Sequence, residues 1–415
     1  MTPLDSGARV WAGLAVAPSS GLMFIVGVLL AGALVGEFIA ATTRLPRVVG
    51  YTLAGCAAAA FGHGVGMPLA GAAQTVTDLA LGLLLFEIGC RVHLRWLARN
   101  PGLAATSLAE ALLSAVAVAF VMRLFEVGWQ TAVACAILAM PAPAAVAGRV
   151  ALELGAEGQV TQRALLLTAL NTLYAVIALT LMRTWWAADD GGSLTQALAG
   201  LSISLLTTLG LSALLAGAVY LAARRLDLRN ESAALLLFGL VAFALVAARA
   251  IGVSTLLMPL LAGLLLRNTS ERPWVWPRHF GTSGGALVLM LFVIVGSAWT
   301  PQILFAGGFA ALALLATRFL VKAAAIIALA PWAKVSWRQG LALSITMTPL
   351  SATALVMLSE LMRAEPDLAR GAVPIILTSI AVLELFGPIA VQFALRLAGE
   401  LPPPPQRKPR KEAAP

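Results

Sequence analysis

The sequence is short of charged residues. Lysine, arginine, aspartate and glutamate make up 11% of its 415 residues, whereas a soluble globular protein carries about 25%. A chain with so few charges cannot cover a water-facing surface of its own size, which excludes most soluble enzymes and nucleic-acid-binding proteins. Apolar residues make up 60%, enough for about a dozen membrane-spanning helices of roughly 20 residues each. The composition predicts an all-α polytopic membrane protein.

Residue types that often bind metals or perform catalysis are also scarce. The three cysteines and three histidines lie far apart, without the spacing of a metal site or a disulfide framework. Neither a phosphate loop of the Walker type nor a nucleophile elbow occurs. We therefore expect no metal, no cofactor and no enzymatic activity. The net charge of +9 indicates basic cytoplasmic loops rather than a nucleic-acid partner.

Hydrophobic runs follow one another along nearly the whole chain. The thirteen predicted spans cover about 21–42, 46–62, 74–92, 101–122, 127–149, 163–183, 196–223, 233–250, 252–267, 281–299, 302–330, 338–362 and 371–396. An odd number of spans places the two termini on opposite sides of the bilayer.

The basic residues predict the orientation. With a cytoplasmic C-terminus, twenty of the 28 lie on the cytoplasmic side, six on the other side, and Arg318 and Lys322 within a span. This asymmetry follows the positive-inside rule. We expect a multi-pass protein of a bacterial inner membrane, with an extracytoplasmic segment at 1–20 and a disordered, basic cytoplasmic tail at 399–415.

Helix-breaking residues divide the chain into two equivalent halves. Thirteen spans give a first repeat at 21–183, a linker helix at 196–223 and a second repeat of inverted orientation at 233–398. The fifth span contains Pro141 and Pro143, and the equivalent twelfth contains Thr348 and Pro349. Paired interruptions of this kind are typical of transporters, which bind ions where helices are broken near the membrane midplane.

Three stretches carry a resemblance to a known family. They are LPRVVGYTLAG at 45–55, LALGLLLFEIGCRVHLRWL in the third span and GVSTLLMPLLAGLLLRN at 252–268. In this order they resemble the second, third and ninth helices of the monovalent cation:proton antiporter family. This likeness extends over about 21–398. It implies the sodium/hydrogen exchanger fold, with two broken helices crossing in a core domain, a separate dimerisation domain, a homodimer and elevator-type alternating access.

The resemblance also implies site residues. The family carries a hydroxyl residue before a proline in the fifth span, and Pro143 matches that proline while Pro141 and Ala142 stand where the hydroxyl residue is expected. In the sixth span Asn171 matches, but Thr172 stands where the family has its essential aspartate. Lys322 fits the family's basic residue in the eleventh span.

Other groups must therefore supply the missing charge. Glu110 and Glu384 lie deep in their spans, with no basic residue within a helical turn for Glu110. Lys322 either pairs with one of these acids or carries the proton itself. Arg318 is expected to reach a helix-break carbonyl or a water-filled cavity. Glu87, four residues before Arg91, either forms a structural ion pair with Arg91 or takes part in transport.

The sequence predicts a secondary transporter that exchanges protons for Na⁺ or K⁺ across a lipid bilayer, with an atypical ion site that lacks the usual aspartate. The alternative is a transport-inactive, channel-like or anion-transporting descendant of the same fold, since Lys322 and the positive ends of broken helices suit an anion.

Overall fold

The predicted spans correspond to helices in the structure, a computed structural model. It describes residues 20–43, 45–63, 67–189, 194–225, 231–269, 280–298, 301–350 and 352–402. Within these ranges the chain is helical and contains no strand. The predicted N-terminal segment before Ser20 and the predicted tail beyond residue 402 lie outside the described residues.

Each predicted span coincides with one helix or with two short helices. The helices are α2 (Ser20–Thr43), α3 (Val48–Ala58) with the π-turn η1 (Ala59–His63), α4 (Gly71–Arg91), α5 (Leu94–Ala98), α6 (Pro101–Leu124), α7 (Trp129–Leu138), α8 (Ala144–Leu154), α9 (Gln159–Asp189), α10 (Leu194–Arg225), α11 (Glu231–Ile251), α12 (Leu257–Thr269), α13 (Phe280–Gly296), α14 (Pro301–Leu329), α15 (Trp337–Thr346), α16 (Ala352–Ala364) and α17 (Pro366–Ala398). Six of them, α4, α6, α9, α10, α14 and α17, are individually long and apolar enough to cross a membrane. The total of thirteen crossings stays a prediction.

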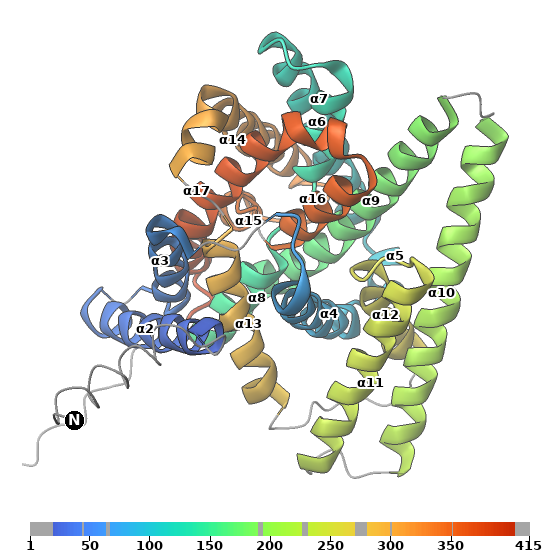
Figure 1. Cartoon of the computed structure of the whole chain (residues 1–415). Helices are drawn as coiled ribbons and strands as arrows, with labels where there is room; N and C mark the ends of the chain where they lie inside the picture. The colour runs from blue at the N-terminus through green and yellow to red at the C-terminus, as the bar shows by residue number, and fades with distance from the viewer. Residues whose placement is uncertain are drawn as a thin grey trace, which may run out of the picture.

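Seven helices, α2–α4 and α10–α13, form what we call the row. α2 packs on α3, α3 on α13, α13 on α4, and α4 on α12, with α10 and α11 beyond α12. Figure 1 shows this row from α2 and α3 at lower left to α10 on the right. In an inverted repeat α3 is equivalent to α12, and α4 to α13, so the contact between α3 and α13 has its counterpart in the contact between α12 and α4.

Glycines make these two equivalent contacts possible. A methyl group added to Gly55 of α3 would collide with the carbonyl oxygen of Val293 in α13, and one added to Gly263 of α12 would collide with that of Phe86 in α4. Small residues of this kind let the backbones of membrane helices approach closely. Gly55 and Gly263 both follow an alanine, as they would if the predicted repeat relates α3 to α12.

Helices α6–α9 and α14–α17 form what we call the core bundle, and the short α5 packs against α6. α14 packs against α6, α15 and α17, while α17 also packs against α7, α8 and α16. Most of these helices lie in the upper part of Figure 1, whereas α8 lies lower, beside α13 and α4. Their contacts place four elements, α6, α7, α9 and α15, around the middle of the bundle. One feature was not expected from the sequence, a kink in α14 at Gly308, which has a φ of 42°.

Candidate ion-binding site

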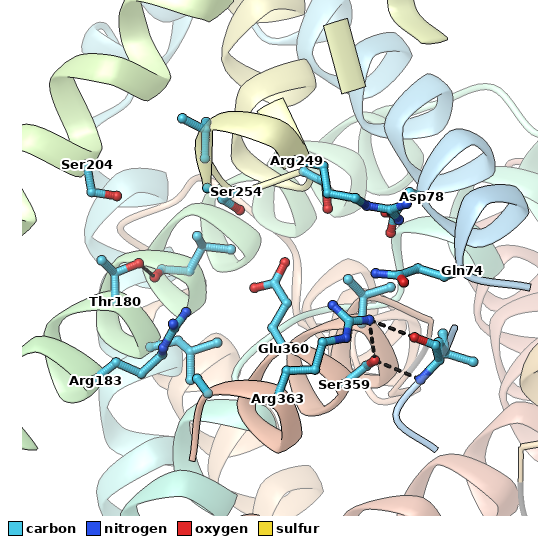
Figure 2. A pocket seen from close by; sticks show the side chains of 18 residues that line it. Gln74, Asp78, Thr180, Arg183, Ser204, Arg249, Ser254, Ser359, Glu360 and Arg363 are labelled. Carbon is cyan, nitrogen blue, oxygen red and sulfur yellow. Dashed lines mark hydrogen bonds and ion pairs between the residues drawn. The ribbon is translucent and has the colours of Figure 1, made fainter. Parts of the chain in front are cut away.

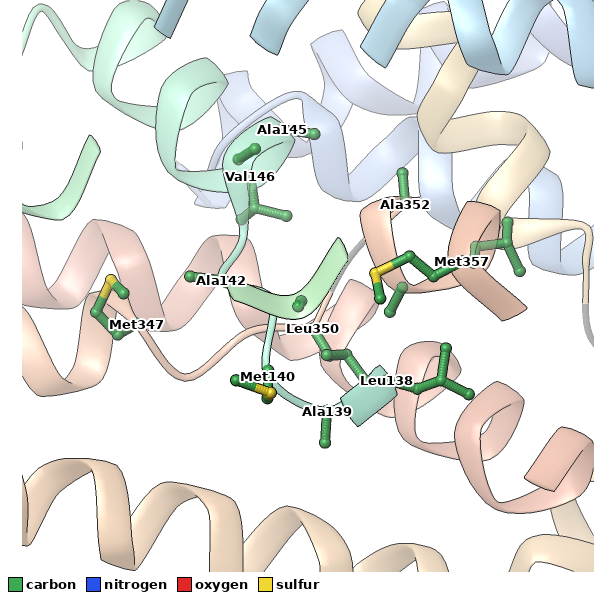
Figure 3. Close-up of a cluster of buried hydrophobic side chains, with 14 of the residues drawn as sticks. Leu138, Ala139, Met140, Ala142, Ala145, Val146, Met347, Leu350, Ala352 and Met357 are labelled. Atoms are coloured by element: carbon green, nitrogen blue, oxygen red, sulfur yellow. The ribbon is translucent and has the colours of Figure 1, made fainter. Parts of the chain in front are cut away.

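Two interrupted helices meet in the middle of the core bundle. α7 ends at Leu138 and α8 begins at Ala144, while α15 ends at Thr346 and α16 begins at Ala352. The prolines at 141, 143 and 349 cannot donate a backbone hydrogen bond, so the helices stop there. Figure 3 shows the two extended segments passing close to each other, with Met140, Ala142, Met347 and Leu350 among the buried side chains around them. The broken-helix crossing expected from the sequence is present.

Arg318 of α14 joins the two interruptions. Its Nε donates to the carbonyl oxygen of Ala139 at 2.7 Å, and its Nη2 donates to those of Pro141 at 2.9 Å and Pro349 at 3.3 Å. Its Nη1 donates to the carbonyl oxygen of Thr348. The guanidinium, 1% exposed, thus satisfies carbonyls left free by both broken helices, whose ends also carry partial negative charge.

A second buried group contains the missing carboxylate. The Nζ of Lys322 lies 2.6 Å from Oε2 of Glu110, and the Nδ2 of Asn171 donates to Oε1 of Glu110 at 2.6 Å. Lys322 also donates to the carbonyl oxygen of Met140 at 3.3 Å, which ties the group to the interruption after α7. All three side chains are at most 1% exposed. We call Glu110, Asn171 and Lys322 the carboxylate triad.

The triad joins three helices that the sequence separates. Glu110 comes from α6, Asn171 from α9 and Lys322 from α14. Of the two acids considered as partners for Lys322, the structure places Glu110 beside it. Thr172 does not contact Lys322 through its hydroxyl, which instead donates to the carbonyl oxygen of Thr168 one turn earlier. The Oδ1 of Asn171 is buried without a hydrogen-bond partner among the described residues, so it is available as an acceptor.

The other acids in the predicted spans are arranged differently. Glu384 of α17 is 1% exposed, and neither carboxyl oxygen has a hydrogen-bond partner in the described part of the chain. Glu87 forms the expected pair with Arg91 at 2.6 Å, and Glu37 pairs with Arg47 at 2.7 Å near the end of α2. The structure therefore brings together four of the predicted residues, Glu110, Asn171, Lys322 and Arg318, around the crossing and leaves Glu384 by itself.

A polar pocket of about 340 Å³ lies at one end of α9. It lies between α16, α9 and the ends of α4 and α11, and Figure 2 shows charged side chains from these helices converging on it. Asp78 forms an ion pair with Arg249, and Arg363 donates to the carbonyl oxygen of Leu69 at 2.8 Å. Asp78 was not among the acids considered from the sequence, although it lies inside the third predicted span.

A second pocket, of about 670 Å³, lies at the opposite end of α9. α9 contributes Thr161 and Leu166 to it, and Val176 and Arg183 to the pocket described above. Partial burial, and then the charge of Arg267, lower the pKa of the His93 side chain that lines this second pocket. The ten residue-to-residue steps of α9 from Leu166 to Val176 span about 15 Å at 1.5 Å per residue, and Asn171 lies in the middle of this interval.

The described residues offer no site for a metal held by histidine, cysteine, aspartate or glutamate. No three such side chains come together in the part of the chain that the structure describes. The side chain of His63 and the whole of His279 lie outside that part. The oxygens of the triad are instead of the kind that bind a hard monovalent cation.

Comparisons with known proteins agree with the fold. The family model described as "Sodium/hydrogen exchanger, transmembrane" matches residues 25–397. A structure of the sodium proton antiporter MjNhaP1 from Methanocaldococcus jannaschii at pH 8 superposes with a TM-score of 0.64 and 13% identity, over 90% of this chain and 98% of that one. An electron-microscopy structure of the same antiporter gives 0.69 and 16%, over 94% and 100%. The sequence matches none of the curated proteins with which it was compared. At these identities the structural likeness is one of fold.

Proposed function

The chain belongs to the sodium/hydrogen exchanger transmembrane family, and we propose that it exchanges protons for a monovalent cation, Na⁺ or K⁺, by alternating access. The single observation that carries the proposal is the contact of the buried Glu110 carboxylate with both Lys322 and Asn171. A proton-coupled exchanger needs a buried anionic group for which a proton-carrying group and a cation compete. Glu110 supplies the charge that Thr172 cannot.

The exchange step follows from the chemistry of the triad. In the structure the Lys322 ammonium forms an ion pair with the Glu110 carboxylate. An entering cation binds the Glu110 oxygens and the free Oδ1 of Asn171, and Lys322 releases its proton to water as its ion pair is lost. One positive charge enters and one leaves, so this step is electrically neutral. Lys322 is then the proton carrier, and Glu110 is the cation ligand.

Burial explains why the two ions exclude each other. An ionised group at mid-bilayer costs about 2.5–3.5 kcal/mol on insertion scales, so an unpaired Glu110 carboxylate is strongly disfavoured. In the proposed cycle either the lysine or the cation neutralises it. A site that cannot be empty couples the two fluxes, because each ion enters only as the other leaves.

We propose that ions reach the triad from the two pockets at opposite ends of α9. We infer that the core bundle moves as an elevator relative to the row of α2–α4 and α10–α13, and opens the triad to one pocket at a time. By the charge asymmetry of the loops, the pocket near Arg183 is extracytoplasmic and the pocket near Arg267 cytoplasmic. The assignments of the repeats to 21–183 and 233–398, of the linker helix to 196–223 and of a homodimer remain part of this proposal.

The test is proton movement in proteoliposomes on addition of Na⁺, K⁺ or Li⁺. Wild-type protein should release protons with at least one cation, and Glu110→Gln and Lys322→Gln should each reduce this flux to the level of empty liposomes. Glu87→Gln is the matched control, since Glu87 pairs with Arg91 on one helix away from the triad. No flux from correctly folded wild-type protein with any cation would overturn the proposal and favour a transport-inactive descendant of the fold.

A double variant tests whether a carboxylate on α9 can replace the Glu110 carboxylate on α6. Glu110→Gln combined with Asn171→Asp returns the carboxylate to α9 while keeping one amide and one acid in contact. We expect partial recovery of the flux lost in Glu110→Gln. If the double variant is as inactive as the single one, the position on α6 is itself required.

A further inference from the structure

Glu384 is the acid that the proposed exchange step leaves unused. Its side chain is 1% exposed, and both carboxyl oxygens are buried without a hydrogen-bond partner among the described residues. Glu110, in contrast, has a donor on each oxygen. Buried polar groups without partners are rare in native proteins, and each requires a structural or functional explanation.

The position of Glu384 links it to the broken-helix crossing. It lies near the middle of α17, which begins at Pro366 and ends at Ala398. Three residues later, a methyl group added to Gly387 would lie 2.7 Å from the Cβ of Pro349, at the interruption between α15 and α16. Because residues three apart share one face of a helix, Glu384 is on the side of α17 that packs against the crossing.

Charged side chains on the helices around α17 do not neutralise Glu384. On α14, Lys322 is bound to Glu110, and Arg318 donates to carbonyls of the interruptions. The other charged side chains considered on packed elements are Arg149 and Glu153 on α8, Glu360 and Arg363 on α16, Arg163 and Arg183 on α9, and Arg338 on α15. No ion pair from any of them to Glu384 occurs in the described structure.

The energetic cost of a charge in the membrane determines whether Glu384 is ionised or protonated. Without a partner, an ionised carboxylate at this depth costs about 2.5–3.5 kcal/mol on insertion scales, whereas the protonated form carries no charge. In the conformation described, Glu384 is therefore protonated. Movement of the core bundle that exposed it to water would allow that proton to leave.

We propose that Glu384 is a second proton-binding site, which loads and releases one proton in each transport cycle. The inference rests on the proposed exchange function and sets its coupling ratio. The triad exchanges one proton for one cation without net charge. A proton that binds a Glu384 carboxylate oxygen from water on one side and returns to water on the other adds one uncompensated charge, so the cycle is electrogenic.

The experiment compares transport current with cation flux for Glu384→Gln, in which an uncharged amide replaces the carboxyl group at nearly the same volume. In wild-type proteoliposomes, cation flux should respond to an imposed membrane potential, which acts on every net charge moved. In Glu384→Gln the net charge moved per cation should fall from about one elementary charge to about zero, while a proton gradient still drives cation flux. Glu87→Gln should keep the wild-type ratio. An unchanged ratio in Glu384→Gln would overturn the inference.

A spectroscopic measurement separates this inference from the proposed function and does not depend on transport. Infrared difference spectra of the whole protein between high and low pH should contain a protonated-carboxyl band that Glu384→Gln removes and Glu87→Gln keeps. If wild-type protein shows no exchange but the band titrates, the proposed function fails and the proton site stands. If exchange occurs but no titrating band is lost in Glu384→Gln, the proton site fails.

Discussion

Helices are held together by different contacts in the middle of the core bundle and in the neighbouring row. At the broken-helix crossing, Arg318 and the carboxylate triad fill the space between helices with charged groups. At the contacts of α3 with α13 and of α4 with α12, glycines bring backbone against backbone. Neither region depends mainly on the hydrophobic effect, which provides little attraction between helices in lipid.

This difference indicates which region can change during transport. Side-chain partners at the crossing can be exchanged, since a cation can take the place of a lysine ammonium. A backbone contact at a glycine has no alternative partner and no space for one. In the proposed mechanism the row is therefore the rigid part, and the core bundle is the part that moves and binds ions.

The largest effect is expected from removing Arg318. Arg318→Ala leaves four carbonyl oxygens of the two interruptions without their donor, and each unsatisfied buried group costs about 1–3 kcal/mol. The sum approaches the total stability of about 5–15 kcal/mol of a native protein. We expect little folded protein in detergent, measured by size-exclusion chromatography and thermal unfolding.

Two variants sharpen the result for Arg318. Arg318→Lys keeps the charge and up to three donors, so it should recover part of the folded yield. Arg370→Ala, which removes an exposed arginine paired with Asp367 at 3.3 Å, should leave the yield unchanged. If Arg318→Ala were as stable as the wild type, the crossing would not depend on this side chain.

A smaller effect is expected at the glycine contacts. The methyl group of Gly263→Ala would collide with the carbonyl oxygen of Phe86 and lie 2.9 Å from the backbone nitrogen of Cys90. Overpacking of this kind costs about 1–3 kcal/mol, and we expect a lower midpoint of thermal unfolding. Gly210→Ala on α10 is the matched control, because no atom lies within 4 Å of its added methyl group.

The control should move in the other direction. Alanine favours a helix over glycine by about 1 kcal/mol, so Gly210→Ala should be neutral or slightly stabilising. Equal destabilisation by both variants would show that helix flexibility, rather than the close contact, decides the outcome. The contrast between the row and the core bundle would then lose its basis.

Much of this arrangement could be predicted from the sequence. The hydrophobic runs gave the helices, because a helix that crosses lipid must be long and apolar. Pro141, Pro143 and Pro349 gave the two interruptions, because proline breaks a helix locally. The absence of an aspartate at Thr172 gave the need for another acid.

The partner of Lys322 and the glycine contacts could not be predicted from the sequence, because both depend on distances between helices. Glu110 and Glu384 were equal candidates to pair with Lys322, since each is isolated along the chain. Only the packing of α6 against α14 places Glu110 beside Lys322 and leaves Glu384 alone. The contact of Gly263 with Phe86 was hidden for the same reason, because a glycine in a membrane helix does not reveal its neighbour.

The smallest effect is expected at the edge of the core bundle, where one carboxylate caps a helix. Glu400, after the end of α17, accepts hydrogen bonds from the backbone nitrogens of Val160 at 2.5 Å and Thr161 at 2.8 Å, in the first turn of α9. Capping groups of this kind contribute about 0.5–2 kcal/mol, and a negative charge also suits a helix N-terminus.

Glu400→Ala should therefore loosen the start of α9 without unfolding the protein. We expect faster amide hydrogen exchange at Val160 and Thr161 and a small decrease in the unfolding midpoint, while the exposed neighbour Glu157, changed to glutamine, should alter neither. Proton release driven by cations should persist, because Glu400 is remote along α9 from Asn171. A loss of transport as complete as that of Glu110→Gln would mean that the end of α9 acts on the triad, and that the polar contacts of the core bundle cannot be exchanged one at a time.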